Sequence, residues 1–310
     1  MDGQAHRRRA IPGEFALCLT HDVDRPFKTY QAVYDAIRNR SPGELGALRP
    51  GVNPYWQFGT IMDLEVEFGV RSTFYVLNEP SLFAYEPTAW VRPANWIEHF
   101  GRYDPTNPRI EAVLRRLADG GWEVGLHASR LAATDRERLA AEKETLESVL
   151  DAPVAGVRHH HLELGTDTWD HHREVGFAYD ASLGDVGSPG FQHGYGLHYP
   201  DGGSFPVFPL TAMEIGLPDP DTAPTAARAE VDNLLAEAAR NDAVMTVLWH
   251  PRYFSEDEFP GYRDLYRFLL RRATAMNAWI GPPRDALAHL EGSESGSRAR
   301  ITAGGERDGR

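Results

Sequence analysis

Cysteine and lysine are scarce in this chain of 310 residues. Cys18 is the single cysteine, so no disulfide can form within the chain, and its place in an apolar run favours a small core residue over a nucleophile. Lys28 and Lys143 are the only lysines, and the formal net charge is −13. Because a nucleic-acid surface needs clustered cations facing the phosphates, this composition argues against a nucleic-acid partner.

Long apolar segments are also missing. The sequence contains no run of about 18 apolar residues that could span a bilayer. The polar, arginine-containing start of the chain lacks the apolar core of a secretory signal. These absences predict a soluble, cytoplasmic protein without a transmembrane segment. With 42% hydrophobic residues the chain can still bury a substantial core, and its length favours one large α/β domain over two smaller ones.

Apolar runs typical of buried strands alternate with amphipathic helical segments. Strands are expected at 15–22, 72–77, 122–127, 155–159, 244–249 and 277–281. Helices are expected at 29–40, 54–68, 107–119, 134–150, 166–176, 221–240 and 258–276. Thr134 and Glu137 form the pattern of a capping box, and the glycine after residue 119 suits a helix end. This alternation predicts βα units around a mostly parallel sheet or barrel.

Four segments fall outside this alternation. Residues 79–106, rich in proline and tryptophan, and residues 184–205, rich in glycine and aromatic residues, are expected to be irregular covering or binding loops. Residues 1–13 are expected to be a flexible start, and residues 291–310, composed of glycine, serine and charged residues, a disordered tail. The predicted folded domain therefore covers residues 14–290.

Five apolar runs end in polar residues of the kinds that enzymes use. The runs are FALCLTHDVD (15–24), WEVGLHASR (122–130), VAGVRHHHL (154–162), FAYDASL (177–183) and VMTVLWHP (244–251). They carry Asp22, Asp24, His127, Arg158, His160, Asp180 and His250. Each residue alone is explained equally well as a strand cap or a turn residue. Because sites in α/β folds form where parallel strands end, the five runs together predict one site.

Strand alternation indicates which of these side chains share a face. It places Asp22 beside Asp24, and Arg158 beside His160. Two carboxylates on one face repel each other, so they require a cation or a positively charged neighbour. One carboxylate and two imidazoles, from Asp24, His127 and His160, would leave a coordination position open for water, as catalytic zinc requires.

The two remaining polar strand ends suit acid chemistry and orientation. His250 suits general acid work because an imidazole gains and loses its proton near neutral pH. Asp180 would orient Arg158 or another polar partner through a hydrogen bond.

In their order, these segments resemble the motifs of the polysaccharide deacetylase family, also described as the NodB homology domain or carbohydrate esterase family 4. THDVD (20–24) resembles the family's TFDDG segment, and GWEVGLHASR (121–130) resembles its GxEIGxH strand. GVRHHHL (156–162), YDASL (179–183) and VLWHP (247–251) are similar to the arginine, aspartate and final histidine motifs. The resemblance runs from about residue 14 to residue 285 and implies a distorted (β/α) barrel of about seven strands.

The resemblance also implies an activity and a role for each residue. The family reaction is the hydrolysis of an N-acetyl group from an amino sugar, here in a polysaccharide, a glycolipid or their precursor. A carbohydrate would be the partner and a divalent metal, zinc above others, the cofactor. By resemblance, Asp22 is the general base, Arg158 orients it and His250 is the general acid. Asp24 and His127 would bind the metal.

One position departs from the family pattern. The second metal histidine of the family lies four residues after the first, where this chain has Leu131. We expect His160 to replace it, because His160 shares a face with Arg158 and the chain resembles a divergent branch with an RxHxL motif. Two alternatives remain: a catalytically silent carbohydrate-binding barrel, or a hydrolase of another non-peptide carbon–nitrogen bond.

Overall fold

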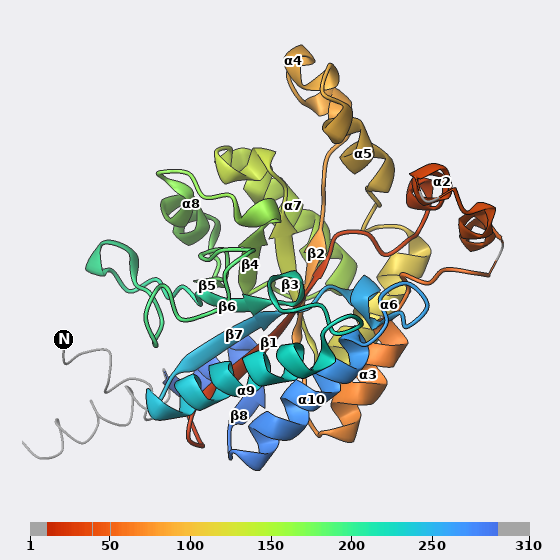
Figure 1. Cartoon of the computed structure of the whole chain (residues 1–310). Coiled ribbons are helices and arrows are strands. Elements are labelled where there is room, and N and C mark those ends of the chain that lie inside the picture. Colours follow the sequence, from red (N-terminus) through yellow and green to blue (C-terminus); the bar gives the residue numbers. More distant parts are fainter. Residues whose placement is uncertain (1–10, 39, 50, 291–310) are drawn as a thin grey trace, which may run out of the picture.

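A parallel sheet that curls into a half-barrel forms the centre of the molecule (Figure 1). A computed structural model describes residues 11–38, 40–49 and 51–290. The strands are β1 (Ala16–Val23), β2 (Thr73–Leu77), β3 (Glu123–Ala128), β4 (Gly156–His159), β5 (Tyr179–Asp180), β6 (Leu210–Met213), β7 (Val244–Leu248) and β8 (Trp279–Gly281). The strand order is β5-β4-β3-β2-β1-β7-β6, with β8 paired to β1. This arrangement confirms the predicted distorted (β/α) barrel of about seven strands.

The central strand β1 shows why the sequence reads as nearly continuous apolar runs. All its residues are buried, because helices and loops cover both faces of a parallel sheet. Leu17 and Leu19 belong to the larger core cluster, whereas Ala16 and Cys18 belong to a second cluster. Successive side chains of β1 thus serve opposite faces, as strand alternation requires. The second cluster also contains Ile11 and Leu290, near the two limits of the described chain.

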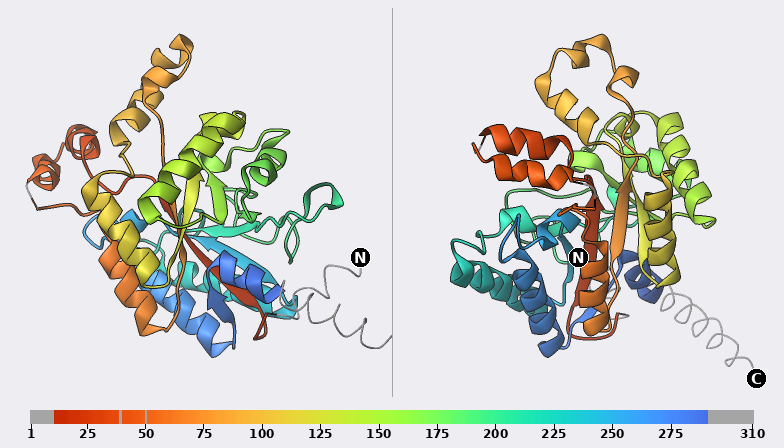
Figure 2. Two further views of the ribbon diagram at one scale, coloured as in Figure 1. Left: turned by 180° about the vertical axis from the view of Figure 1, so that it is seen from behind. Right: turned by 90° about the vertical axis from the view of Figure 1, so that its right-hand side faces the viewer.

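Helices surround the sheet, as Figures 1 and 2 show. The α-helices are α2 (Tyr30–Arg38), α3 (Phe58–Glu67), α4 (Pro87–Trp90), α5 (Pro93–Gly101), α6 (Pro108–Asp119), α7 (Arg136–Leu150), α8 (Thr168–Val175), α9 (Pro224–Arg240) and α10 (Tyr262–Ala275). Short 3-10 turns are η1 (Pro42–Leu48), η2 (Leu82–Ala84), η3 (Leu131–Ala133), η4 (His160–Leu162), η5 (Pro200–Gly202), η6 (Glu214–Gly216) and η7 (Pro251–Phe254).

Helix α6 illustrates how local sequence fixes an element. Its side chains Ile110, Val113, Leu114 and Leu117 are buried, which is the spacing of one helical face. The Asn107 side chain caps its start by accepting a hydrogen bond from the backbone N–H of residue 109, and the chain leaves the helix at glycine 120, as predicted.

Three sequence expectations differ from the structure. Helix α7 is capped by Asp135, whose side chain accepts from the backbone N–H of Arg138, so the capping box predicted at Thr134 is wrong. Residues 79–106 contain α4 and α5 besides irregular chain. Strand β6 was not expected, because Pro206 and Pro209 interrupt the apolar run that leads into it.

Two expectations concern the ends of the chain. The disordered tail expected at 291–310, and most of the flexible start expected at 1–13, lie outside the described residues. In the part of the chain that the structure describes, no helix is both long and apolar enough to cross a membrane.

The carboxyl ends of the strands meet at one edge of the sheet. The register pairs Asp22 of β1 with Tyr75 of β2, and His127 of β3 with Arg158 of β4. The segment with α2 and η1 follows β1, and the segment with η2, α4 and α5 follows β2, so both project from this edge (Figure 1). Parallel α/β sheets carry their sites at this edge.

Candidate active site

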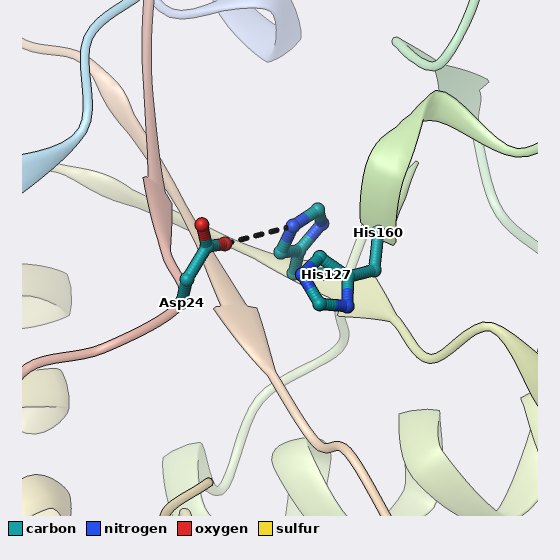
Figure 3. Close-up of side chains that lie close together, drawn as sticks. All are labelled: Asp24, His127 and His160. Carbon is teal, nitrogen blue, oxygen red and sulfur yellow. Dashed lines mark ion pairs between the residues drawn. The ribbon is translucent and has the colours of Figure 1, made fainter. Parts of the chain in front are cut away.

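A carboxylate and two imidazoles meet at the carboxyl edge of the sheet (Figure 3). Asp24, His127 and His160 each offer one ligand atom, and these atoms lie within 4.8 Å of one another. His127 Nε2 lies 3.1 Å from Asp24 Oδ1 and 3.7 Å from Asp22 Oδ2. The His127 and His160 rings meet edge to face, with centroids 5.2 Å apart. We call Asp24, His127 and His160 the cation cluster.

Strand and turn position the two imidazoles differently. His127 lies within β3, and its Nδ1 is 2.9 Å from the carbonyl oxygen of Arg158, which leaves Nε2 toward Asp24. Strand β4 ends at His159, so His160 lies in η4 and strand alternation does not govern its direction. His161 and Leu162 have positive φ angles of 59° and 55°, and this turn brings His160 to the edge of the sheet.

The donor set of the cation cluster fits a divalent metal. One carboxylate oxygen and two imidazole nitrogens are typical of catalytic zinc with a position left for water. Asp24 Oδ1 is buried, and although His127 Nε2 lies 3.1 Å away, the oxygen accepts no well-directed hydrogen bond among the described residues, as expected of an atom that faces a cation. Burial favours the neutral acid, but the pKa of Asp24 is held well below its usual range by His250 and His127. Burial lowers the pKa of His160 and thus favours the neutral, ligating imidazole.

Asp22 is paired with a buried guanidinium. Arg158 Nη1 donates to Asp22 Oδ1 at 2.9 Å and to Thr20 Oγ1 at 2.8 Å. Arg158 Nε donates to the carbonyl oxygen of Ala181 at 2.8 Å, and the guanidinium lies over the Tyr75 ring at 4.6 Å. These contacts fix the guanidinium, which in turn fixes the direction of the Asp22 carboxylate.

His250 lies at the other side of Asp24. Its Nε2 is 3.2 Å from Asp24 Oδ2, and its Nδ1 is 2.6 Å from Glu214 Oε1. Burial opposes protonation of the ring, but the carboxylates of Glu214 and Asp24 outweigh it and raise the pKa of His250 to about 10. The imidazole therefore carries a proton at neutral pH, with Nε2 directed toward the cation cluster.

Asp180 stands apart from this group. Its Oδ1 accepts from the backbone N–H of Ser182 at 2.9 Å and from Trp169 Nε1 at 3.3 Å, and its Oδ2 accepts from the Ser182 hydroxyl at 2.6 Å. Arg158 donates instead to the carbonyl oxygen of Ala181. The expected contact between Asp180 and Arg158 is therefore absent, and Asp180 bonds to other polar groups, those of Ser182 and Trp169. Its bond to the backbone of Ser182 holds the chain next to Ala181, whose carbonyl oxygen Arg158 contacts.

The sequence interpretation missed three charged residues at the site. Glu79 follows β2 by two residues and approaches His160, and Glu214 follows β6 directly and contacts His250. Arg252, two residues after His250, has its Nη1 3.5 Å from an oxygen of Asp24. An acid within two residues of the end of an apolar run is the signal that would have identified Glu79.

A cavity of about 240 Å³ adjoins the cation cluster. Its lining includes Glu79, Leu82, Tyr85, Arg92, Arg130 and Leu131. Leu131, which occupies the position of the missing family histidine, is therefore part of a wall of this cavity. Glu79 links the cavity to the cluster, because its Oε2 lies 3.4 Å from His160 Nδ1.

Comparison with known proteins gives matches at the level of structure. No protein-family model and no curated protein matches this chain. A protein described as a polysaccharide deacetylase from Mycobacterium smegmatis matches with a TM-score of 0.60 and 18% identity, over 91% of this chain and 92% of that chain. One from Pseudomonas aeruginosa PAO1 matches with a TM-score of 0.57 and 14% identity, over 92% of this chain and 93% of that chain.

A third match shows that the fold is not restricted to one activity. The 4-alpha-glucanotransferase from Thermococcus litoralis matches 88% of this chain with a TM-score of 0.51 and 16% identity, although only 38% of its own chain is covered. Likeness at such identities establishes a fold, and the chemistry must come from the site itself. The coverage of nearly the whole of both deacetylase structures, together with the curled parallel sheet of this chain, shows that it has the NodB-like fold of the polysaccharide deacetylases.

Proposed function

We propose that this chain is a metal-dependent hydrolase that removes an N-acetyl group from an amino sugar in a polysaccharide, a glycolipid or their precursor. The observation that carries the proposal is the meeting of the cation cluster with Asp22 on one side and the protonated His250 on the other. A metal site flanked by a base and an acid is what hydrolysis of an unactivated amide requires.

Asp24, His127 and His160 would hold the divalent cation, for which zinc is our assignment. When bound, this cation supplies a Lewis acid that polarises the amide carbonyl and favours loss of a proton from water. Asp22, oriented by Arg158, takes the proton of the attacking water. The water oxygen bonds to the carbonyl carbon and the carbon–nitrogen bond breaks. His250 gives its Nε2 proton to the departing nitrogen, so the products are acetate and a free amine.

Glu214 suits His250 to this task. Because Glu214 accepts at Nδ1, the Nε2 proton is the one presented toward the substrate. The raised pKa keeps that proton in place until a nitrogen more basic than the amide develops. After transfer, the neutral imidazole returns to the charged form by taking a proton from solvent, and Asp22 releases to solvent the proton that it took from water, so both groups are restored.

The cavity beside the cluster is where we place part of the sugar. Arg92 offers hydrogen-bond donors for hydroxyl groups, and Leu82 and Leu131 offer an apolar wall for a ring face. Mixed linings of this kind suit a carbohydrate, which has polar edges and apolar faces.

Two other functions use the same residues differently. Leu131 motivates a silent carbohydrate-binding barrel, but the approach of His160 to Asp24 and His127 restores three ligands and favours catalysis. A hydrolase of cyclic amides would need the same base, acid and cation, and would differ only in the substrate.

Acetate release from a panel of N-acetylated amino sugars and oligosaccharides tests the proposal. We expect the zinc-loaded full chain to release acetate, and expect chelation with EDTA to stop the release and added zinc to restore it. Cyclic amides incubated in parallel identify the second hydrolase activity. A chain that binds zinc and sugar but hydrolyses neither class of amide would be the silent barrel.

A further inference from the structure

Glu79 is a buried carboxylate that the catalytic scheme above does not use. Its side chain follows β2 and is 6% exposed. Its Oε1 accepts a hydrogen bond from the Tyr85 hydroxyl, whereas its Oε2 makes no hydrogen bond among the described residues. Burying a carboxylate with an unsatisfied oxygen costs free energy, so a partner or a task is expected for that oxygen.

The ring of His160 approaches that oxygen. Glu79 Oε2 lies 3.4 Å from His160 Nδ1, and Nδ1 itself has no hydrogen bond among the described residues. The other ring nitrogen, Nε2, is then the one available to the cation cluster, and Figure 3 shows one nitrogen of His160 directed toward Asp24 and His127. Glu79 does not belong to the group of three possible ligands. It would therefore contact a ligand, His160, and not the cation itself.

The two imidazoles of the cluster need different kinds of support. His127 lies in a strand, and its Nδ1 is backed by the carbonyl oxygen of Arg158 at 2.9 Å. His160 lies in the η4 turn, where backbone pairing of the sheet has ended. A ligating histidine usually donates its second ring N–H to a carboxylate or carbonyl, which fixes the tautomer and the direction of the ring.

We propose that Glu79, held by Tyr85, is the positioning residue of His160: its Oε2 accepts a hydrogen bond from Nδ1–H and so directs Nε2 to the cation. This inference rests on the proposed metal-dependent function. It explains how a histidine from a turn can replace the histidine that is absent at Leu131, because the chain just after β2 supplies a buried acceptor for the ring, which the backbone beyond β4 does not. Tightening of a 3.4 Å contact to hydrogen-bond length is expected when the cation binds.

Zinc affinity of the purified full chain, measured by isothermal titration calorimetry with zinc alone, tests the inference. Glu79→Gln removes the charge and leaves the volume, and we expect zinc affinity to fall about 10–100-fold. Glu163→Gln is the matched control, because Glu163 lines the same cavity but pairs with Arg130, and it should leave zinc affinity unchanged. Unchanged affinity in Glu79→Gln overturns the inference.

A double-mutant cycle with His160→Ala separates positioning from general structural support. If Glu79 acts through His160, adding Glu79→Gln to His160→Ala causes no further loss of zinc affinity. An equal loss in both backgrounds overturns the inference.

Circular dichroism checks the fold of each variant. If Glu79→Gln does not fold, Tyr85→Phe replaces it in the test: zinc affinity is again expected to fall, and unchanged affinity again overturns the inference. A wild-type chain that binds no zinc overturns the proposed function as well, whereas normal wild-type binding with unaffected Glu79→Gln overturns this inference alone.

Discussion

At the scale of single residues, neighbours assign different roles to similar groups. Asp22 and Asp24 come from the same strand end, yet Asp22 faces the Arg158 guanidinium whereas Asp24 faces three imidazoles. A carboxylate held by a guanidinium remains available to a water molecule, while one surrounded by imidazoles suits a cation. The proposed division into base and ligand therefore rests on these contacts and not on residue type.

Replacing Asp22 with asparagine tests its role as base. The amide keeps the size of the side chain but cannot take a proton, so we expect acetate release to fall roughly 10²–10⁴-fold. Zinc should remain bound, because Asp22 is outside the group of possible ligands. Turnover and zinc content are measured on the same preparation, and near-normal turnover would exclude Asp22 as the base.

At the scale of elements, a pair of histidines joins β4 to α8. His159 Nε2 lies 2.9 Å from His172 Nε2, and the rings stack with an angle of 12° between their planes. Burial lowers the pKa of each ring from 6.5 to about 3, so both are neutral in the folded chain at neutral pH. In the unfolded chain each ring takes up a proton near its ordinary pKa.

This pair predicts a loss of stability in mild acid. Between pH 6.5 and about 3 the unfolded chain binds more protons than the folded chain, so the free energy of unfolding rises with pH in this window. The stabilisation is complete above about pH 6.5 and decreases as pH falls toward 3. We expect the wild-type chain to be less stable at pH 5 than at pH 7 by about 2 kcal/mol for each histidine.

Urea unfolding at the two pH values measures this difference. His172→Gln removes one of the two groups, and because His172 also contributes to the lowered pKa of His159, it should reduce the loss between pH 7 and pH 5 by at least half. His193→Gln changes an exposed histidine and serves as the control. The same pH dependence in wild type and His172→Gln would show that the pair does not cause it.

At the scale of the whole molecule, the proposed metal site connects distant parts of the chain. Its ligands come from the end of β1, from β3 and from η4, which the order of the parallel sheet brings to one edge. A cation bound by all three would hold these strand ends together in the folded chain only, because the unfolded chain has no preformed site.

Zinc is therefore expected to stabilise the fold. At a free concentration about 100 times the dissociation constant, linkage predicts a gain of about 2.7 kcal/mol in the free energy of unfolding. The melting temperature of the metal-free chain, measured with and without zinc, shows this gain. EDTA should reverse it, and His160→Ala should reduce it. A melting temperature insensitive to zinc at all concentrations would argue against a site made in the folded state.

The sequence by itself determined the βα alternation, the end of α6 and the strand ends that carry the site residues. These features depend on local periodicity and on turn chemistry, which are readable from neighbouring residues. Asp22, Asp24, His127, Arg158, His160 and His250 were predicted together, because polar residues after parallel strands share one edge of a sheet.

Tertiary structure alone decided which of these groups touch. The partner of His250 is Glu214, which follows a strand that two prolines hide in the sequence, and the neighbour of His160 is Glu79, an acid 81 positions earlier in the chain. Asp180 likewise turned out to bond to Ser182 and Trp169. Such contacts depend on the order of the strands in the sheet, which no single segment of the chain specifies. They also depend on the turn at η4, whose positive φ angles fall on residues that are not glycines and so give no turn signal in the sequence.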